Sequence, residues 1–274
     1  MIEKLQLKNL QNLYCDGVCC ALGEFIDVYS INWADLEGKM TDQMLEDMCK
    51  FTFLKNKMAG VEKMFIRMPR TTKTFFDEYK MKGRLIVPAT KMFDLVTDDI
   101  VGDRIMLEID NLIDITEGYL SQVSDFLGRT ESPVMIKIGK DLKEVGQIVN
   151  RYNMSPIETL ENFGFLDREC YLQGLNFIDK DDQKLIKDYD AVVVFSPRSD
   201  GEEGLGGINL YNFDNRGLKF VFSSGKCYNI DMLAEGKLAL INTANLLYKR
   251  GLVSQQRVME ALQTECTSEV TTHK

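Results

Sequence analysis

Short apolar runs, rich in Val, Ile, Leu and Phe, recur along the chain and are separated by stretches with helical periodicity. Each run is apolar at consecutive rather than alternate positions, which is typical of strands covered on both faces. The first run also fits a loop over Tyr14–Cys20. The predicted strands are Leu13–Cys19, Val61–Ile66, Arg84–Pro88, Arg104–Ile109, Val134–Ile138, Tyr171–Leu175, Ala191–Phe195 and Lys219–Ser223.

The stretches between these runs carry start and stop signals of helices. Ser155-Pro156-Ile157-Glu158 is a capping box with proline at the first helical position, and Gly164 is placed to end that helix. Other helices are predicted over Asp114–Leu127, Leu142–Tyr152 and Asp231–Tyr248, and after Thr41, Asp179 and Ser254.

Strands that alternate with helices predict a parallel sheet with right-handed crossovers. Eight strand candidates predict closure into a (β/α)8 TIM barrel of the α/β class. The prediction is one barrel domain over residues 1–263, followed by a polar tail over 264–274.

Charge, apolar run length and cysteine content disfavour a nucleic-acid-binding or membrane-spanning protein and favour a cytoplasmic one. The chain of 274 residues carries 33 Lys plus Arg against 42 Asp plus Glu, a net charge of −9, which argues against nucleic-acid binding. No apolar run approaches the ~18 residues of a membrane span, and residues 1–10 do not resemble a signal peptide. Seven irregularly spaced cysteines predict free thiols and a cytoplasmic location.

The single histidine, His273, lies next to the last residue. A histidine-built zinc site needs two or three imidazoles, and a nucleophile–base triad usually needs one in the interior. This count disfavours both kinds of chemistry.

Three cations follow predicted strands, where the active-site face of a barrel is expected. Lys137 and Lys140 flank the end of the fifth strand; they fit a solvated pair better than a Schiff-base lysine. Arg198 fits two roles equally: binding a carboxylate or phosphate, or pairing with an acidic neighbour.

Two further motifs have structural interpretations. Gly201–Gly207 matches neither phosphate-binding glycine motif and contains two glutamates, so a loop after a strand is favoured. Asp179–Asp182 lacks the glycine and terminal glutamate of a calcium loop, so carboxylates at a helix N-terminus are favoured.

Four stretches occur in a recognisable order: 40–61, 143–166, 195–200 and 229–232. The second contains Lys143-Glu144-Val145 and Ser155–Leu160, and the third reads Phe195-Ser196-Pro197-Arg198-Ser199-Asp200. Together they resemble the aminohydrolase branch of the amidohydrolase superfamily, which includes guanine deaminase, S-adenosylhomocysteine deaminase and the triazine chlorohydrolases. The resemblance spans residues 10–263.

The resemblance implies a TIM barrel whose members hold zinc or iron and use a metal-bound hydroxide to displace ammonia or chloride. It places Lys140 at the catalytic glutamate and Phe195 at a seventh-strand histidine. The implied metal-ligand positions are Leu13, Cys15, Lys137, Gly174 or Phe177, and Ser224. None of these residues is a histidine or an aspartate, so the resemblance predicts a barrel without its metal and without another cofactor.

The resulting prediction is a catalytically inactive pseudoenzyme that binds a small anionic or purine-like ligand, or a protein. Its pocket candidates are Lys137, Lys140, Arg198, Ser224, Cys15 and Phe195. The alternative is an enzyme with replaced, lysine-based chemistry; a decayed relative without activity fits the same residues. The family's flanking β-sandwich has no counterpart, which predicts a homo-oligomer or a complex with an active relative.

Overall fold

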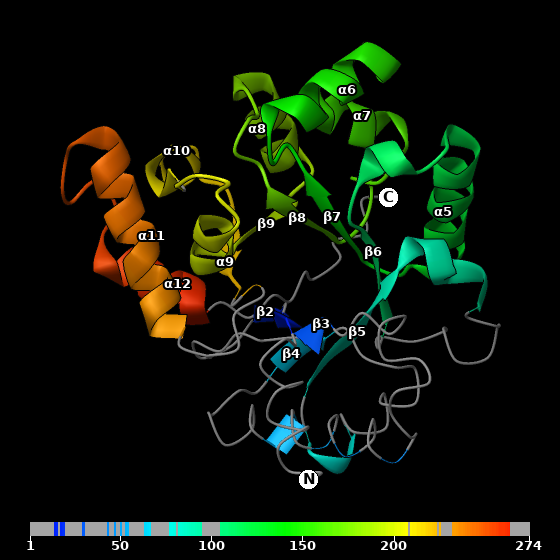
Figure 1. Ribbon diagram of the computed structural model, residues 1–274, viewed down its shortest axis with the longest axis horizontal. Helices are drawn as coiled ribbons and strands as arrows, with labels where there is room; N and C mark the ends of the chain where they lie inside the picture. The colour runs from blue at the N-terminus through cyan, green and yellow to red at the C-terminus, as the bar shows by residue number, and fades with distance from the viewer. Residues whose placement is uncertain are drawn as a thin grey trace, which may run out of the picture.

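The computed structural model describes residues 105–207, 209–223, 225 and 232–263 (Figure 1). It also describes shorter stretches of the N-terminal third: 14–15, 17–19, 29–30, 43, 47, 50, 53–54, 63–66, 77–80 and 82–94. Figure 1 shows the described helices on the outside of a curled sheet. None of the described helices is long and apolar enough to cross a bilayer.

The main sheet has eight strands in the order β10-β9-β8-β7-β6-β5-β4-β2. Strands β4 to β10 are parallel, and the two end strands, β10 and β2, contact each other, so the sheet curls round. Their bounds are β2 Gly17–Cys19, β4 Lys63–Ile66, β5 Lys82–Pro88, β6 Ile105–Ile109, β7 Val134–Ile138, β8 Cys170–Gly174, β9 Val192–Phe195 and β10 Phe220–Phe222.

The strand predicted at residues 13–19 needs a correction. It is divided into β1 (Tyr14–Cys15) and β2, and β1 pairs with β3 (Tyr29–Ser30) outside the main sheet. Strand β2 runs antiparallel to β4, with Gly17 opposite Ile66, so it does not begin a parallel β/α unit. The apolar pattern locates a strand, but its direction depends on its partner. The other seven predicted strands overlap β4 to β10.

Most of the described helices match predicted ones, whereas the short helices at Pro197–Glu202 and Leu210–Asn215 were not predicted. Helix α6 has the predicted bounds, and Asp114–Leu127 divides into a 3-10 turn, η3 (Leu112–Asp114), and α5. The predicted helix after Thr41 falls largely outside the described residues. The remaining bounds are η2 Ala89–Asp94, α5 Glu117–Thr130, α6 Leu142–Tyr152, α7 Pro156–Asn162, α8 Lys180–Asp188, α9 Pro197–Glu202, α10 Leu210–Asn215, α11 Met232–Leu247 and α12 Gln255–Gln263.

The structure describes both of the motifs that had structural interpretations, the helix start at Asp179 and the loop at Gly201–Gly207. Asp179 caps α8, where its side chain accepts hydrogen bonds from the N–H groups of Asp181 and Asp182, as a helix-start role requires. The predicted loop over Gly201–Gly207 is partly wrong, because α9 extends through Glu202. Proline at the first position of α9 favours a helical start directly after β9.

Aromatic packing fills both faces of the sheet. On the inner face, the rings of Phe65 and Tyr171 pack edge to face at 5.3 Å. On the helix-covered face, Phe195 packs against Phe213 of α10 and against Phe222 of β10. Burial of such rings contributes several kcal/mol each, on the order of 2–3 per side chain, and anchors the helices that carry the site.

The capping box at α7 is linked to a buried acid. Ser155 Oγ accepts from the Glu158 N–H at 3.3 Å, and Glu158 Oε2 accepts from the Ser155 N–H at 2.7 Å. The Ser155 hydroxyl also donates to Oδ1 of Asp182, which is 1% exposed. Burial raises the pKa of Asp182. The Ser155 hydroxyl therefore caps the start of α7 and also donates a hydrogen bond to a buried carboxyl group.

We expect Ser155→Ala to lower the free energy of unfolding by about 2 kcal/mol, because a cap and a donor to a buried acid are lost together. The matched control is Ser254→Ala, which removes only the cap hydrogen bond from the Arg257 N–H. That control should cost about 1 kcal/mol or less in urea denaturation. Equal losses in the two variants would contradict the coupling to Asp182.

Candidate functional site

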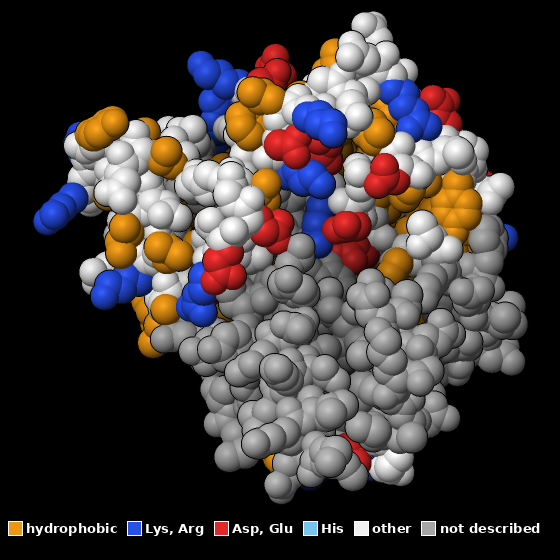
Figure 2. Space-filling view, viewed as in Figure 1, with side chains coloured by type: hydrophobic (Ala, Val, Ile, Leu, Met, Phe, Trp, Pro, Cys, Tyr) orange, Lys and Arg blue, Asp and Glu red, His pale blue; other side chains and the backbone are white. Residues whose placement is uncertain are grey.

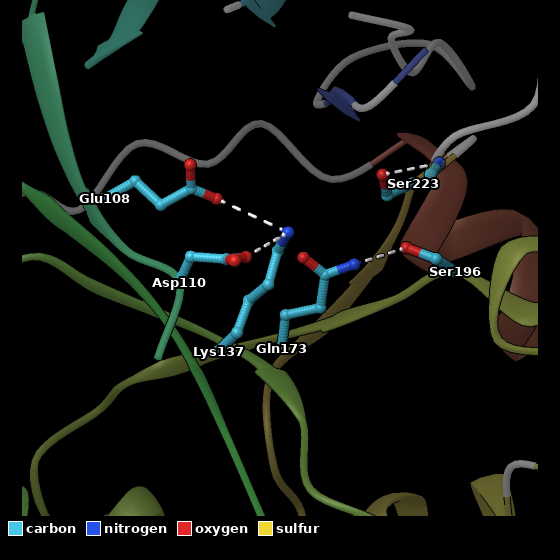
Figure 3. Close-up of polar contacts among 7 residues, drawn as sticks. Glu108, Asp110, Lys137, Gln173, Ser196 and Ser223 are labelled. Carbon is cyan, nitrogen blue, oxygen red and sulfur yellow. Dashed lines mark hydrogen bonds and ion pairs between the residues drawn. The ribbon is translucent and has the colours of Figure 1, made fainter. Parts of the chain in front are cut away.

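The strand register gathers polar side chains on the inner face of the sheet. Paired residues of parallel strands point to the same side, and the direction alternates along each strand. Lys137 is paired with Gln173, and Glu108 is paired with Met135, two residues before Lys137. The inner positions at the carboxyl ends of β6 to β10 form a polar cluster: Glu108, Asp110, Lys137, Gln173, Ser196 and Ser223 (Figure 3).

Lys137 is held between two carboxylates. Its Nζ lies 2.7 Å from Asp110 Oδ1 and 3.6 Å from Glu108 Oε1. Glu108 is 5% exposed, so its attraction to the ammonium acts in a medium less polar than water. The two acids therefore more than offset the positive charge of Lys137 within the cluster.

An amide and two hydroxyls complete the polar cluster. Gln173 Nε2 donates to Ser196 Oγ at 2.8 Å, and Ser223 Oγ accepts from the Gly225 N–H at 3.0 Å. Gln173 is 7% exposed, and its Oε1 has no hydrogen-bond partner among the described residues. A buried acceptor without a partner is costly, and this one faces the side of the cluster where Lys137 lies (Figure 3).

Gly225 is required by close packing beside Ser223. Its φ of +57° lies in the left-handed region, and a Cβ there would stand 2.3 Å from Ser199 Cβ. Any other residue would displace Ser199 or the end of β10. This turn therefore fixes the position of Ser223 in the polar cluster.

A second set of charges lies on α9 and α11, next to the polar cluster. Arg198 Nη2 is 3.1 Å from Glu235 Oε1, and the Arg198 N–H donates to Glu235 Oε2 at 3.1 Å. Glu235 is fully buried. Of the two sequence-based roles for Arg198, the structure supports pairing with an acidic neighbour. Figure 2 shows acidic and basic side chains gathered over this region.

Asp200 is a buried acid of the same group. Burial raises its pKa to about 7, and repulsion from Glu203 and Glu235 acts in the same direction. A hydrogen bond from the Ser196 backbone and attraction to Lys137 act against the rise. The influence of Lys137 on Asp200 joins the α9 charges electrostatically to the polar cluster.

The raised pKa predicts that stability falls as pH rises. Between its ordinary pKa of 3.8 and about 7, Asp200 holds a proton in the folded chain that it loses in the unfolded chain. The stabilisation of the folded state by this bound proton is fully present below pH 3.8 and is lost as the pH rises through about 7. We expect Asp200→Asn to remove this dependence and to raise stability at pH 8 by on the order of 2 kcal/mol.

The measurement is urea denaturation of both proteins between pH 5 and pH 8. The control is Asp125→Asn, which changes an exposed aspartate on α5. The control should keep the slope of the unsubstituted chain. Parallel curves for Asp200→Asn and the unsubstituted chain would contradict the raised pKa.

The structure brings some predicted site residues together and separates others. Lys137 belongs to the polar cluster, and Arg198 lies in the neighbouring charge group. Lys140 lies in the turn before α6, where its N–H donates to Glu144 Oε2 at 2.9 Å. Phe195 packs outward against α10, away from the polar cluster. Cys15 is described only as part of β1, and Ser224 lies outside the described residues.

Sequence reasoning missed most of the polar cluster. Glu108 interrupts the apolar strand Ile105–Ile109, and Gln173 interrupts Cys170–Gly174. Lone polar residues in strands buried on both faces are costly unless they face a polar site, and this signal could have found them. Glu235 carries a weaker signal, since a single acid on a long helix is common at surfaces.

No model of a known protein family matches the chain. The 5-methylthioadenosine/S-adenosylhomocysteine deaminase of Thermococcus kodakarensis is 26% identical over 125 residues, which are 44% of this chain and 30% of that protein. The chain thus matches less than a third of the length of that relative.

Two solved structures share the fold at low sequence identity. An adenosine deaminase from Xanthomonas campestris with bound zinc has a TM-score of 0.69 at 12% identity and covers 84% of this chain and 57% of its own. A guanine deaminase from C. acetobutylicum with bound guanine has a TM-score of 0.67 at 13% identity and covers 91% of this chain and 71% of its own.

Proposed function

We propose, from the premise that this chain is a relative of the amidohydrolase superfamily, that it is a metal-free barrel which binds a small molecule without hydrolysing it. The ion-paired Lys137 at the carboxyl ends of the strands is the observation that carries the proposal. The resemblance aligns this residue with a metal-binding histidine. In this proposal the ligand binds at the carboxyl ends of the strands, where (β/α)8 barrels have their active sites, but no metal-dependent hydrolysis takes place there.

The residues of the polar cluster do not fit a zinc or iron ion. Both carboxylates that could bind a metal, Glu108 and Asp110, face the ammonium of Lys137 instead. A metal ion beside this ammonium would be repelled. Within the described part of the chain, no three His, Cys, Asp or Glu side chains are grouped to hold a metal. The only histidine of the sequence is His273.

The charges of the site favour a neutral ligand over an anionic one. Lys137 and Arg198 already pair with carboxylates, so an anion would have to compete with those acids. Gln173 Oε1 is a buried acceptor that a ligand N–H could satisfy. A purine-like base has N–H donors and a flat apolar body, and guanine occupies the active site of the C. acetobutylicum structure. We therefore propose a purine-like ligand.

The lysine-based alternative needs a neutral amine as nucleophile. Glu108 and Asp110 stabilise the charged ammonium of Lys137 instead. This geometry supports binding over Schiff-base formation. Borohydride treatment with candidate carbonyl compounds should therefore leave no mass adduct on Lys137.

Two measurements test the proposal together. We expect purified protein to contain zinc and iron far below one ion per chain, and to bind guanine in calorimetry without releasing ammonia. Gln173→Leu should weaken guanine binding about tenfold, because a bound N–H then loses its acceptor. Gln183→Leu, which changes a buried glutamine of α8 outside the polar cluster, is the matched control. One metal ion per chain together with deamination of guanine would overturn the proposal.

A further inference from the structure

A groove lies between α11 and the segment that leads into α12, apart from the polar cluster. It has a volume of about 420 Å³. One wall is formed by positions 237, 240, 241 and 244 of α11, which follow the i, i+3, i+4, i+7 spacing of a single helix face. The opposite wall is formed by residues 249–253. The volume falls within the range of about 300–1,000 Å³ that small-molecule sites occupy.

The floor of this groove is apolar and open to solvent. Leu240, Leu252 and Val253 line it, and Ile241 is 45% exposed beside them. Figure 2 shows hydrophobic and basic side chains over α11 and α12, at the left of the view. Covering the floor would remove apolar surface from water, which favours a ligand with an apolar body.

The rim of the groove is basic. Lys237, Lys249 and Arg250 line it, and none of the described residues that line the groove is acidic. None of the three cations forms an ion pair with another described residue. The Lys249 N–H donates to the Ala244 carbonyl at 3.2 Å, which holds the start of the rim against α11.

This local charge is opposite to that of the whole chain. The net charge of the chain is −9, whereas the groove gathers three cations around an apolar floor. An anionic group at the rim would be attracted by these three cations, although the chain as a whole is acidic. Lys137 of the polar cluster and Arg198 of the neighbouring charge group differ, because each is already paired with a carboxylate.

We propose that this groove binds a small organic anion with an apolar body, such as a medium-chain carboxylate. The apolar body lies on Leu240 and Ile241, and the carboxylate faces Lys249 and Arg250 at the rim. The groove volume of about 420 Å³ lies within the range of small-molecule sites, which favours a small molecule as the occupant. The proposal is independent of the ligand of the polar cluster.

The test compares three compounds of equal chain length: octanoate, octan-1-ol and octylammonium. Binding to the full chain is followed by calorimetry and by NMR shifts of α11 residues. Octanoate should bind most tightly of the three. Its affinity should fall as the salt concentration is raised, because salt screens the exposed charges of the rim. Equal binding of octanol, or preference for octylammonium, would overturn the proposal.

Two variants locate the site. The double substitution Lys249→Gln and Arg250→Gln should weaken octanoate binding about tenfold and leave octanol unchanged, since only the charge is removed. The control is Lys143→Gln, an exposed lysine of α6, which should leave octanoate binding unchanged. Unchanged affinity in the double variant overturns the proposal. So does light scattering that shows a dimer disrupted by the same double substitution, because the groove would then be covered by a second copy.

Discussion

Replacing Lys137 by Met is expected to lower the free energy of unfolding by about 3 kcal/mol, because Glu108 is left as a buried carboxylate without its ammonium. The side chain of Lys137 is 17% exposed, so some water reaches the site and the loss falls at the low end of the range for buried pairs. Methionine keeps most of the length of the lysine chain, which limits the loss of packing.

A second substitution separates charge from packing. The double variant Lys137→Met with Glu108→Gln should regain about 2 kcal/mol of that loss, since an amide costs far less to bury than a charged carboxylate. Asp110→Asn is the control, because Asp110 is 71% exposed and should contribute less than about 1 kcal/mol. The readout is urea denaturation at pH 7. If the single and double variants were equally unstable, the ion pair would not be the cause.

Replacing Phe195 by Ala is expected to cost about 4 kcal/mol, the range for removing a buried aromatic ring. Phe195 is 2% exposed, and its ring lies 5.0 Å from that of Phe213 and 5.8 Å from that of Phe220. Truncation would leave a cavity between β9, β10 and α10. The lost energy is therefore one of packing rather than of ligand binding.

The matched control is Phe177→Ala. Phe177 is 40% exposed, so the change should stay within about 0.5 kcal/mol. Guanine binding, measured below the unfolding transition, should be retained in Phe195→Ala. A stable Phe195→Ala variant that no longer binds guanine would contradict the structural role and return Phe195 to the ligand site.

Helix starts and the parallel strands were within reach of the sequence because their signals are local. The capping box at Ser155 needs only the residues that follow it, and it is present with both hydrogen bonds. Strand β7 has the predicted bounds, because its five residues form a short run that is apolar at every position except Lys137. The direction of β2 was not predictable, because it depends on pairing with β4, far along the chain.

The candidate site was predictable only in part. Lys137 could be placed at the end of a strand, but the partners that define its role come from β6 and the residue after it. Arg198 could be placed after β9, but the acid that it binds lies on α11. Each of these acids can be seen in the sequence as a polar residue. No local sequence signal indicates which cation it pairs with.

The sequence by itself determined where the seven parallel strands lie and where several helices begin. It also determined that His273 is the one imidazole of this sequence. Periodicity and caps act through neighbours a few residues apart, so they can be read along the chain. The tertiary structure alone decided that Lys137 pairs with two carboxylates and that Phe195 faces the helices. Those outcomes follow from strand register, which sets the face and the neighbours of every side chain in the sheet.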